Sequence, residues 1–357
     1  MSAHAEFSVG FNQAWLKNNY ARSWTDGWDE DEARTILRLT AKAGGTVLRM
    51  WIFEGLIPGG VAWNNDVAVA LDPRVPRNLD RFLTLAREEG VKVAFALFNG
   101  NMVAEMKIEN KHLRGRWINL LHEQDGAGVA FRKNVLRPVL DVLRRHEESI
   151  ELIDLVNEAD ALFGKGFKEN ILDHGWDTVN AFACRWRDFI RNEGLETPVT
   201  VSLGWPGLFP FWPAAVDQLL EGRLKTSCVD VFVLHLYNDR GEIPHCKKIA
   251  EFRQSTGKKL FLGEFGQSQL NKRYSDSGQT RLTENFIPNA RRCGMDGAWA
   301  WRLKDERPGD NSEARFSYWT FGGPRPALEA FRRCAAEPDI RRPNPRRPEQ
   351  DSAKLAE

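Results

Sequence analysis

Eight short apolar runs, each about the length of a β-strand, alternate with longer amphipathic segments along this chain of 357 residues. Several of the runs are apolar on both faces, as are the strands of a parallel sheet that helices cover on both sides. The runs are Phe7–Phe11, Thr46–Phe53, Val91–Phe98, Ile150–Val156, Pro198–Leu203, Val229–Leu236, Lys259–Leu262 and Gly297–Trp301. The alternation predicts an α/β fold with a parallel sheet.

The segments between these runs have the features of helices. The stretch Asp29–Ala43 begins with acidic residues, which suit a helix N-terminus, and a glycine pair that stops a helix follows it. The other predicted helices are Asn78–Glu89, Val129–Arg145, Trp176–Asn192 and Thr280–Arg292. Eight strands are the number that closes a (β/α)8 TIM barrel. A doubly wound open sheet is the alternative, but the chain contains neither GxGxxG nor GxxxxGK[ST], the phosphate-binding loops typical of such sheets.

Length and charge limit the domain organisation and the partners. Lys and Arg together number 50 and Asp and Glu 49, so a formal net charge of +1 gives no general attraction to nucleic acid or anionic membranes. No apolar stretch approaches the roughly 20 residues of a membrane span. We therefore expect one barrel over residues 1–334, no nucleic-acid or membrane partner, and a disordered tail over 335–357, which is rich in proline and arginine. No residue pattern indicates an oligomeric state.

The five cysteines are scattered and include no CxxC pair, which disfavours zinc ribbons and thioredoxin-type motifs. Free buried thiols in a reducing compartment are the expected state. The first twelve residues lack the basic and apolar segments of a signal peptide. The expected location is therefore cytoplasmic, or secreted if a leader is missing from this sequence.

Functional residues of a barrel gather at the carboxyl ends of its strands, so the polar residues that end each run are the candidates for a site. They are Arg49, Asn99, Asn157, Glu158, His235, Tyr237, Glu264 and Trp301. Two of them are glutamates 106 positions apart, which can face each other only across a closed barrel mouth. A facing pair of carboxyl groups is what glycoside hydrolysis requires.

In this order these motifs resemble glycoside hydrolase clan A, and family 5, the cellulase and mannanase family, is the closest-looking member. The resemblance rests on Asn-Glu after strand four, His-x-Tyr on strand six, Gly-Glu-Phe-Gly on strand seven and Trp on strand eight, and it covers Phe7 to about Trp319. The segments GFNQAWL and RMWIFEG are similar to the β-mannanase-like branch of the family.

The resemblance implies a role for each site residue. Glu158 matches the general acid/base and Glu264 the nucleophile. The substrate-binding residues would be Asn157 at the sugar 2-hydroxyl, Tyr237 and Arg49 on the nucleophile, His235 in the same subsite and Trp301 beneath the sugar. Asn99 stands where many relatives keep a histidine, which leaves its role in substrate binding open. From the residues alone, Arg49 as a structural ion-pair partner and His235 as a core histidine remain alternatives.

Thirteen tryptophans are the outlier of the composition. Trp299 is expected in the core. Among the six that fall near predicted loops, at least two are expected to stack on sugar faces, which are apolar on one side. The six are Trp15, Trp24, Trp28, Trp63, Trp205 and Trp212.

The expected function is that of a retaining β-glycoside hydrolase that uses the two glutamates in a double displacement. A β-mannan or manno-oligosaccharide is the first choice of substrate and a β-glucan the second. A transglycosidase on the same site and a catalytically silent carbohydrate-binding barrel are the alternatives. The histidines are dispersed and no HExxH occurs, so neither a metal nor another cofactor is expected.

Overall fold

The computed structural model describes residues 7–17, 22–54, 59–100, 116, 119–121, 123, 126–162, 175–204, 214–267, 274–305 and 314–337. Eight parallel strands form one sheet, in the order β7-β6-β5-β2-β1-β10-β9-β8. They are β1 (Ser8–Asn12), β2 (Val47–Glu54), β5 (Lys92–Asn99), β6 (Ile150–Asn157), β7 (Val199–Thr200), β8 (Phe232–Tyr237), β9 (Leu260–Gly266) and β10 (Gly297–Trp301). Each overlaps one of the eight apolar runs, so the existence and order of the predicted strands are confirmed, although β7 is shorter and β9 longer than predicted.

The two edge strands meet and close the barrel. Leu203, just beyond β7, bridges Leu234 of β8 in parallel. The His235 N–H donates to the Leu203 carbonyl at 2.8 Å, and the Leu203 N–H donates to the Val233 carbonyl at 3.1 Å. The predicted (β/α)8 barrel is thereby confirmed, and the open sheet is excluded.

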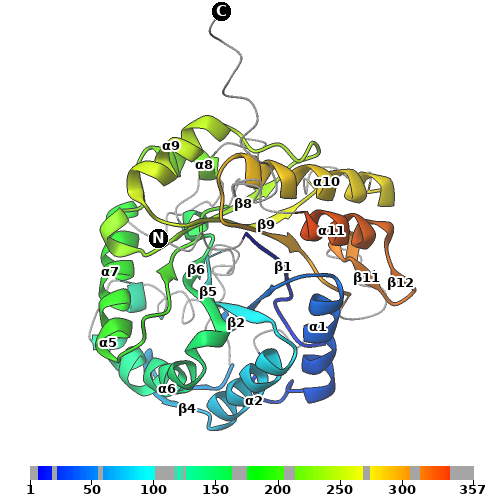
Figure 1. The fold of residues 1–357 in the computed structure, drawn as a ribbon. Helices are drawn as coiled ribbons and strands as arrows, with labels where there is room; N and C mark the ends of the chain where they lie inside the picture. The colour runs from blue at the N-terminus through cyan, green and yellow to red at the C-terminus, as the bar shows by residue number, and fades with distance from the viewer. Residues whose placement is uncertain are drawn as a thin grey trace, which may run out of the picture.

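Helices surround the strands in an outer ring (Figure 1). They are α1 (Glu30–Lys42), α2 (Arg74–Glu88), α5 (Ala127–Phe131) continuing through η3 (Arg132–Leu136) into α6 (Arg137–Arg145), α7 (Trp176–Asn192), α8 (Ala214–Leu220), α9 (Cys246–Thr256), α10 (Asp276–Arg292) and α11 (Pro326–Ala336). The acidic start predicted for α1 is a cap, because the Asp29 side chain accepts from the Glu32 N–H at 2.9 Å. None of the described helices is both long and apolar enough to span a membrane.

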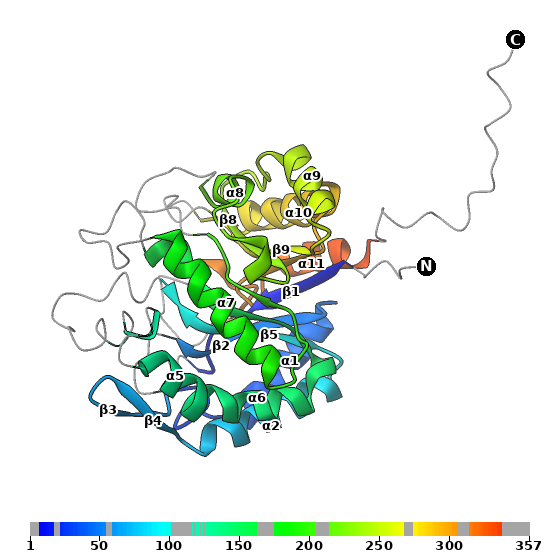
Figure 2. The same cartoon turned by 90° about the vertical axis from the view of Figure 1, so that its left-hand side faces the viewer.

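Two small antiparallel hairpins lie outside the eight-stranded barrel. Strands β3 (Val61–Asn64) and β4 (Val67–Leu71) pair in antiparallel fashion beyond the carboxyl end of β2, and Figure 2 shows them at one end of the barrel. Asn65, in their two-residue turn, has a φ of 52°, which asparagine tolerates better than most residues. Strands β11 (Trp319–Thr320) and β12 (Gly323–Pro324) precede α11.

Inward-facing side chains fill the barrel in layers, as in other barrels of this type. Along β2, alternate residues point inward, and Val47 belongs to an apolar floor that also contains Leu152, Phe261 and Trp299. Trp299 is thus a core residue, as predicted. Two residues further along, Arg49 is fully buried in a polar layer. Trp51, two residues further again, belongs to an apolar group at the mouth that also contains Ala14 and Ala96 and against which Trp15 and Trp301 pack.

Four of the five cysteines form disulfides, so the prediction of free buried thiols is wrong for these four. Cys184 of α7 is bonded to Cys228, and Cys246 at the start of α9 is bonded to Cys293 at the end of α10. The cysteines are scattered in sequence because each bridge joins two neighbouring crossover connections of the barrel. The fifth, Cys334, is a buried free thiol in α11. Disulfides are typical of proteins in oxidising compartments, which counts against the reducing one that we expected.

Loss of either bridge is expected to lower thermal stability. The bridged cysteines lie 44 and 47 positions apart, and closing such a loop stabilises a protein by about 4 kcal/mol in the chain-entropy model. The double variant Cys184→Ser/Cys228→Ser should therefore lose roughly 5–10 °C in Tm by calorimetry. Cys334→Ala is the control for a buried cysteine without a bridge. Titration of five free thiols in the unfolded, unreduced protein would contradict the pairing.

Candidate active site

The barrel mouth brings the two predicted catalytic glutamates together. Glu158 follows β6 directly and Glu264 lies on β9, and both are buried, with 5% and 4% of their surface exposed. One oxygen of each carboxyl group and a ring nitrogen of His235 all lie within 4.8 Å of one another. The prediction that these side chains face each other across a closed mouth is confirmed.

Glu264 is held at both oxygens. Arg49 Nη1 donates to its Oε1 at 2.7 Å, and the Tyr237 hydroxyl donates to its Oε2 at 2.5 Å. Burial raises the pKa of the Glu264 carboxyl and the nearby Glu158 carboxyl adds to the rise, whereas His235, Arg49 and Tyr237 oppose it. The arginine and the phenol therefore stabilise the charged form of a carboxyl group in a poorly solvated place.

Arg49 is the centre of the polar layer. Besides Glu264, its Nη1 group donates to Asn12 Oδ1 at 3.1 Å, and its Nη2 group donates to Asp154 Oδ2 at 2.6 Å and Asn157 Oδ1 at 2.8 Å. Its guanidinium carbon also lies 4.4 Å from the ring centre of Trp51. Strands β1, β6 and β9 are thus tied to one cation on β2, so Arg49 is both a structural ion-pair partner and a direct neighbour of Glu264.

His235 lies between the two glutamates. Its Nδ1 atom is 3.0 Å from Glu158 Oε1 and 3.5 Å from Glu264 Oε1. Burial lowers the pKa of its imidazole to about 4, so the ring is neutral near pH 7. Within the part of the chain that the structure describes, its Nε2 atom has no hydrogen-bond partner. The ring is fully buried yet contacts both glutamates, so it is a core histidine and a site residue at once.

The remaining predicted residues border this group. Asn157 Nδ2 donates to Asn99 Oδ1 at 3.1 Å, so Asn99 contacts the site through another side chain. Trp301 ends β10, is half-buried, and meets Trp51 edge to face with ring centres 5.7 Å apart. All eight predicted residues therefore gather at one end of the barrel.

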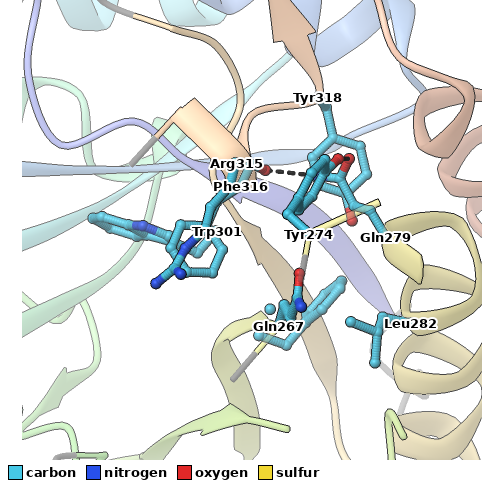
Figure 3. Close-up of a pocket in the computed structure, with 10 residues that line it drawn as sticks. Gln267, Tyr274, Gln279, Leu282, Trp301, Arg315, Phe316 and Tyr318 are labelled. Atoms are coloured by element: carbon cyan, nitrogen blue, oxygen red, sulfur yellow. Dashed lines mark hydrogen bonds between the residues drawn. The ribbon is translucent and has the colours of Figure 1, made fainter. Parts of the chain in front are cut away.

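A small pocket adjoins Trp301 and continues toward α10 (Figure 3). Its walls are largely aromatic, with Phe265, Tyr274, Phe316 and Tyr318 among them. Two of its polar groups already bind each other, because the Tyr274 hydroxyl donates to Gln279 Oε1 at 2.7 Å. The pocket has room for about one water and is too small for a sugar ring, although Trp301 joins it to the predicted site.

Four further residues contribute to the site but were not predicted from the sequence: Asn12, Trp51, Asp154 and Ser202. Asn12 ends β1, so the rule that selected the other strand-end residues applies to it as well. Asp154 is one of two acids in the mostly apolar run Ile150–Val156, and a fully buried acid needs a partner, which was the available signal. Nothing in the sequence distinguishes Ser202.

The tryptophans near predicted loops differ from one another in burial and packing. Trp24 is a core residue, 1% exposed, and its indole N–H donates to the Trp51 carbonyl at 2.8 Å. Trp28 and Trp63 pack against the core as partly buried residues. Trp15 is the one of these four that packs, as Trp301 does, against the apolar group of Ala14, Trp51 and Ala96. Trp205 and Trp212 lie outside the described residues, so the expectation of at least two sugar platforms stays a prediction.

One group of His, Asp and Glu side chains among the described residues has the spacing of a metal site, and it is Glu158, His235 and Glu264 themselves. The cation that contacts this group is Arg49.

The sequence matches no protein-family model and no curated protein. The structure is similar to an endo-1,4-β-mannanase from Eisenia fetida, with a TM-score of 0.65 and 18% identity, over 94% of this chain and 93% of that one. It is also similar to a β-mannanase from Mytilus edulis, with a TM-score of 0.64 and 17% identity, over 93% and 92% of the two chains. A GH5_18 protein from Bifidobacterium longum, solved in complex with Manβ1-4GlcNAc, has a TM-score of 0.66 and 15% identity, over 93% and 78%. The chain therefore has the barrel fold of these β-mannanases and of this GH5_18 protein.

Proposed function

We propose that this protein is a retaining β-glycoside hydrolase that acts by double displacement. The observation that carries the proposal is the pair Glu158 and Glu264, two buried carboxyl groups from the carboxyl ends of β6 and β9 with oxygens within 4.8 Å. Carboxyl groups about 5–5.5 Å apart are typical of retaining enzymes, whereas inverting enzymes separate them by about 6.5–9.5 Å to admit a water. The short separation favours retention.

Glu264 is the proposed nucleophile. It would attack the anomeric carbon and form a covalent glycosyl-enzyme, for which its carboxyl group must be ionised. Arg49 and Tyr237 each donate a hydrogen bond to it, one to each oxygen, and so support the charged form. The same two donors also fix the orientation of the Glu264 carboxylate during attack.

Glu158 is the proposed general acid and base. It would protonate the departing glycosidic oxygen and then take a proton from the water that releases the sugar. A neutral His235 with its hydrogen on Nδ1 donates to Glu158 Oε1, which leaves Oε2 to carry the transferable proton. The imidazole thus orients Glu158 without adding a positive charge that would favour loss of its proton.

The proposed substrate is a β-linked oligo- or polysaccharide, with β-mannan first and β-glucan second. The structural neighbours support mannose, because two are β-mannanases and a third was solved with Manβ1-4GlcNAc. Trp301 would lie beneath the sugar at the cleavage point, where its indole suits the apolar face of the ring, and Asn157 would bind the 2-hydroxyl.

A screen of aryl β-glycosides and β-linked oligosaccharides tests the proposal. Proton NMR during the first turnovers determines the anomeric configuration of the product. The length of the product distinguishes endo from exo action. We expect β-products from a β-mannoside or manno-oligosaccharide. First-formed α-products would exclude retention, and absence of cleavage across the screen would exclude the enzyme class. A product longer than the substrate, favoured by added acceptor sugar, would identify a transglycosidase.

Replacing Arg49 by methionine is expected to move the acidic limb of the pH profile upward. Activity of the free enzyme needs ionised Glu264, so kcat/KM rises with pH through the pKa of that carboxyl, which lies above the ordinary value of 4.5. Removal of the cation that opposes this rise should shift the limb by about 1–3 pH units to higher pH. Arg49→Lys, which keeps the charge, should shift it less.

The control is Arg291→Met, which removes another buried arginine, one whose Nη1 donates to the Cys334 carbonyl. Circular dichroism across the pH range shows whether each variant is folded. An unchanged acidic limb in a folded Arg49→Met protein would contradict the role of Arg49 on the nucleophile.

A further inference from the structure

Beneath the two glutamates, Asp154 of β6 and Ser202 beyond β7 form a fully buried link between them. We propose that Asp154 and Ser202 are positioning residues, which hold Glu158 in its proton-donating position and couple that position to Arg49 and the nucleophile. The inference rests on the proposed function and deepens it, by adding residues that act through others and touch no substrate.

The backbone at Glu158 takes an unusual conformation. Its φ is 52°, in the left-handed region that residues with a side chain disfavour. The neighbouring strand end holds this turn, because the Glu158 N–H donates to Ser202 Oγ at 3.0 Å and the Ala159 N–H donates to the Ser202 carbonyl at 3.0 Å. The direction of the Glu158 side chain therefore depends on Ser202.

Asp154 extends this contact to the nucleophile. Its Oδ1 accepts from the Ser202 N–H at 2.9 Å, and its Oδ2 accepts from Arg49 Nη2 at 2.6 Å. Arg49 in turn contacts Glu264 at 2.7 Å. A continuous series of buried hydrogen bonds thus runs from Glu264 through Arg49, Asp154 and Ser202 to the backbone of Glu158.

The strand end that carries Ser202 must approach the site closely. A side chain added at Gly204 would lie 2.4 Å from His235 Cβ and 2.9 Å from Glu158 Oε1. The Gly204 N–H donates to Asp160 Oδ1 at 3.0 Å, which fastens the same segment a second time. Because this segment lies so close to Glu158, loss of the buried Ser202 hydroxyl removes a hydrogen bond that directly holds the Glu158 backbone.

The chemistry predicts a selective defect for Ser202→Ala. A misplaced acid slows the first step only when the leaving group needs a proton, so kcat/KM should fall about 10- to 100-fold for poor leaving groups such as alkyl or sugar alcohols. It should stay within about twofold for 2,4-dinitrophenyl glycosides, whose leaving group departs unaided. Asp154→Asn also disturbs Arg49, so we expect it to lower kcat/KM for both kinds of substrate.

Thr200→Val is the matched control, because Thr200 is a fully buried hydroxyl residue of β7 that donates to the Val231 carbonyl at 2.8 Å. It should lower kcat/KM equally little for both kinds of substrate. Equal loss by Ser202→Ala on good and poor leaving groups, or no loss on either, would overturn the positioning role.

Hydrogen exchange of the backbone supplies a readout that needs no activity. The amide of Glu158 should exchange at least about tenfold faster in Ser202→Ala than in the wild type, and at the wild-type rate in Thr200→Val. If the wild type cleaves no glycoside, the proposed function fails while the exchange still decides the structural link. Unchanged exchange at Glu158 in Ser202→Ala would overturn the link whatever the activity.

Discussion

Glu264→Ala is expected to lower kcat by roughly 10⁵-fold, on every glycoside that the wild type cleaves. The variant lacks the atom that attacks the anomeric carbon, and no change of leaving group can replace it. The fold should persist, because Arg49 keeps Asp154 at 2.6 Å and Asn157 at 2.8 Å and is not left as an unpaired buried cation. Initial rates and a thermal melt measure the two effects separately.

The product formed with added azide makes this test specific. With the nucleophile gone, azide can enter the space of the missing carboxylate and should yield an α-glycosyl azide from an activated β-glycoside. Glu32→Ala is the control, since Glu32 is another buried glutamate with a cationic partner, Lys304, at 2.6 Å. Near-normal turnover by a folded Glu264→Ala protein would exclude it as the nucleophile.

The barrel itself could be predicted because its strands are apolar on both faces and its helices carry their start and stop signals in the sequence. The boundaries follow the same physics. Strand β6 runs Ile150–Asn157, against a predicted Ile150–Val156. Helix α10 begins at Asp276 rather than Thr280, because the Ser275 side chain caps it by accepting from the Gly278 N–H.

The positions of the site residues could be predicted for a similar reason. Closure of the barrel places every strand end on one rim, so Glu158 and Glu264 must meet although they are 106 positions apart. What each of them contacts depends on side-chain layers inside the barrel. Arg49, Asp154 and Ser202 meet because they lie in one layer, and their spacing in the sequence does not reveal that.

Other features depend on contacts between elements that are distant in sequence. The bridge Cys246–Cys293 forms because α9 and α10 are adjacent in the outer ring (Figure 1). The Cα atoms of the two cysteines lie 4.8 Å apart. Trp24 follows a strand end in sequence, yet the chain folds back and packs its ring against Phe82 and Phe95. Position near a loop was therefore a poor guide to exposure for this tryptophan.

Glu158→Ala is expected to separate substrates by their leaving groups. For a β-linked oligosaccharide, whose sugar alcohol must be protonated to depart, kcat/KM should fall by about 10³-fold, within the range typical of general acid catalysis. For a 2,4-dinitrophenyl glycoside kcat/KM should change little, because that phenolate leaves without a proton. Its kcat should nevertheless drop, since the water that releases the glycosyl-enzyme has lost its base.

Azide provides the complementary evidence. It needs no general base, so it should restore kcat of Glu158→Ala on the activated substrate and give a β-glycosyl azide, opposite in configuration to the product expected from Glu264→Ala. Glu158→Gln keeps the shape beside His235 and should show the same pattern, which would assign the loss to the missing proton rather than to the cavity. Equal loss on all leaving groups without azide rescue would exclude Glu158 from the acid/base role. A misfolded or merely structural variant loses activity on every substrate, whether or not its leaving group requires a proton.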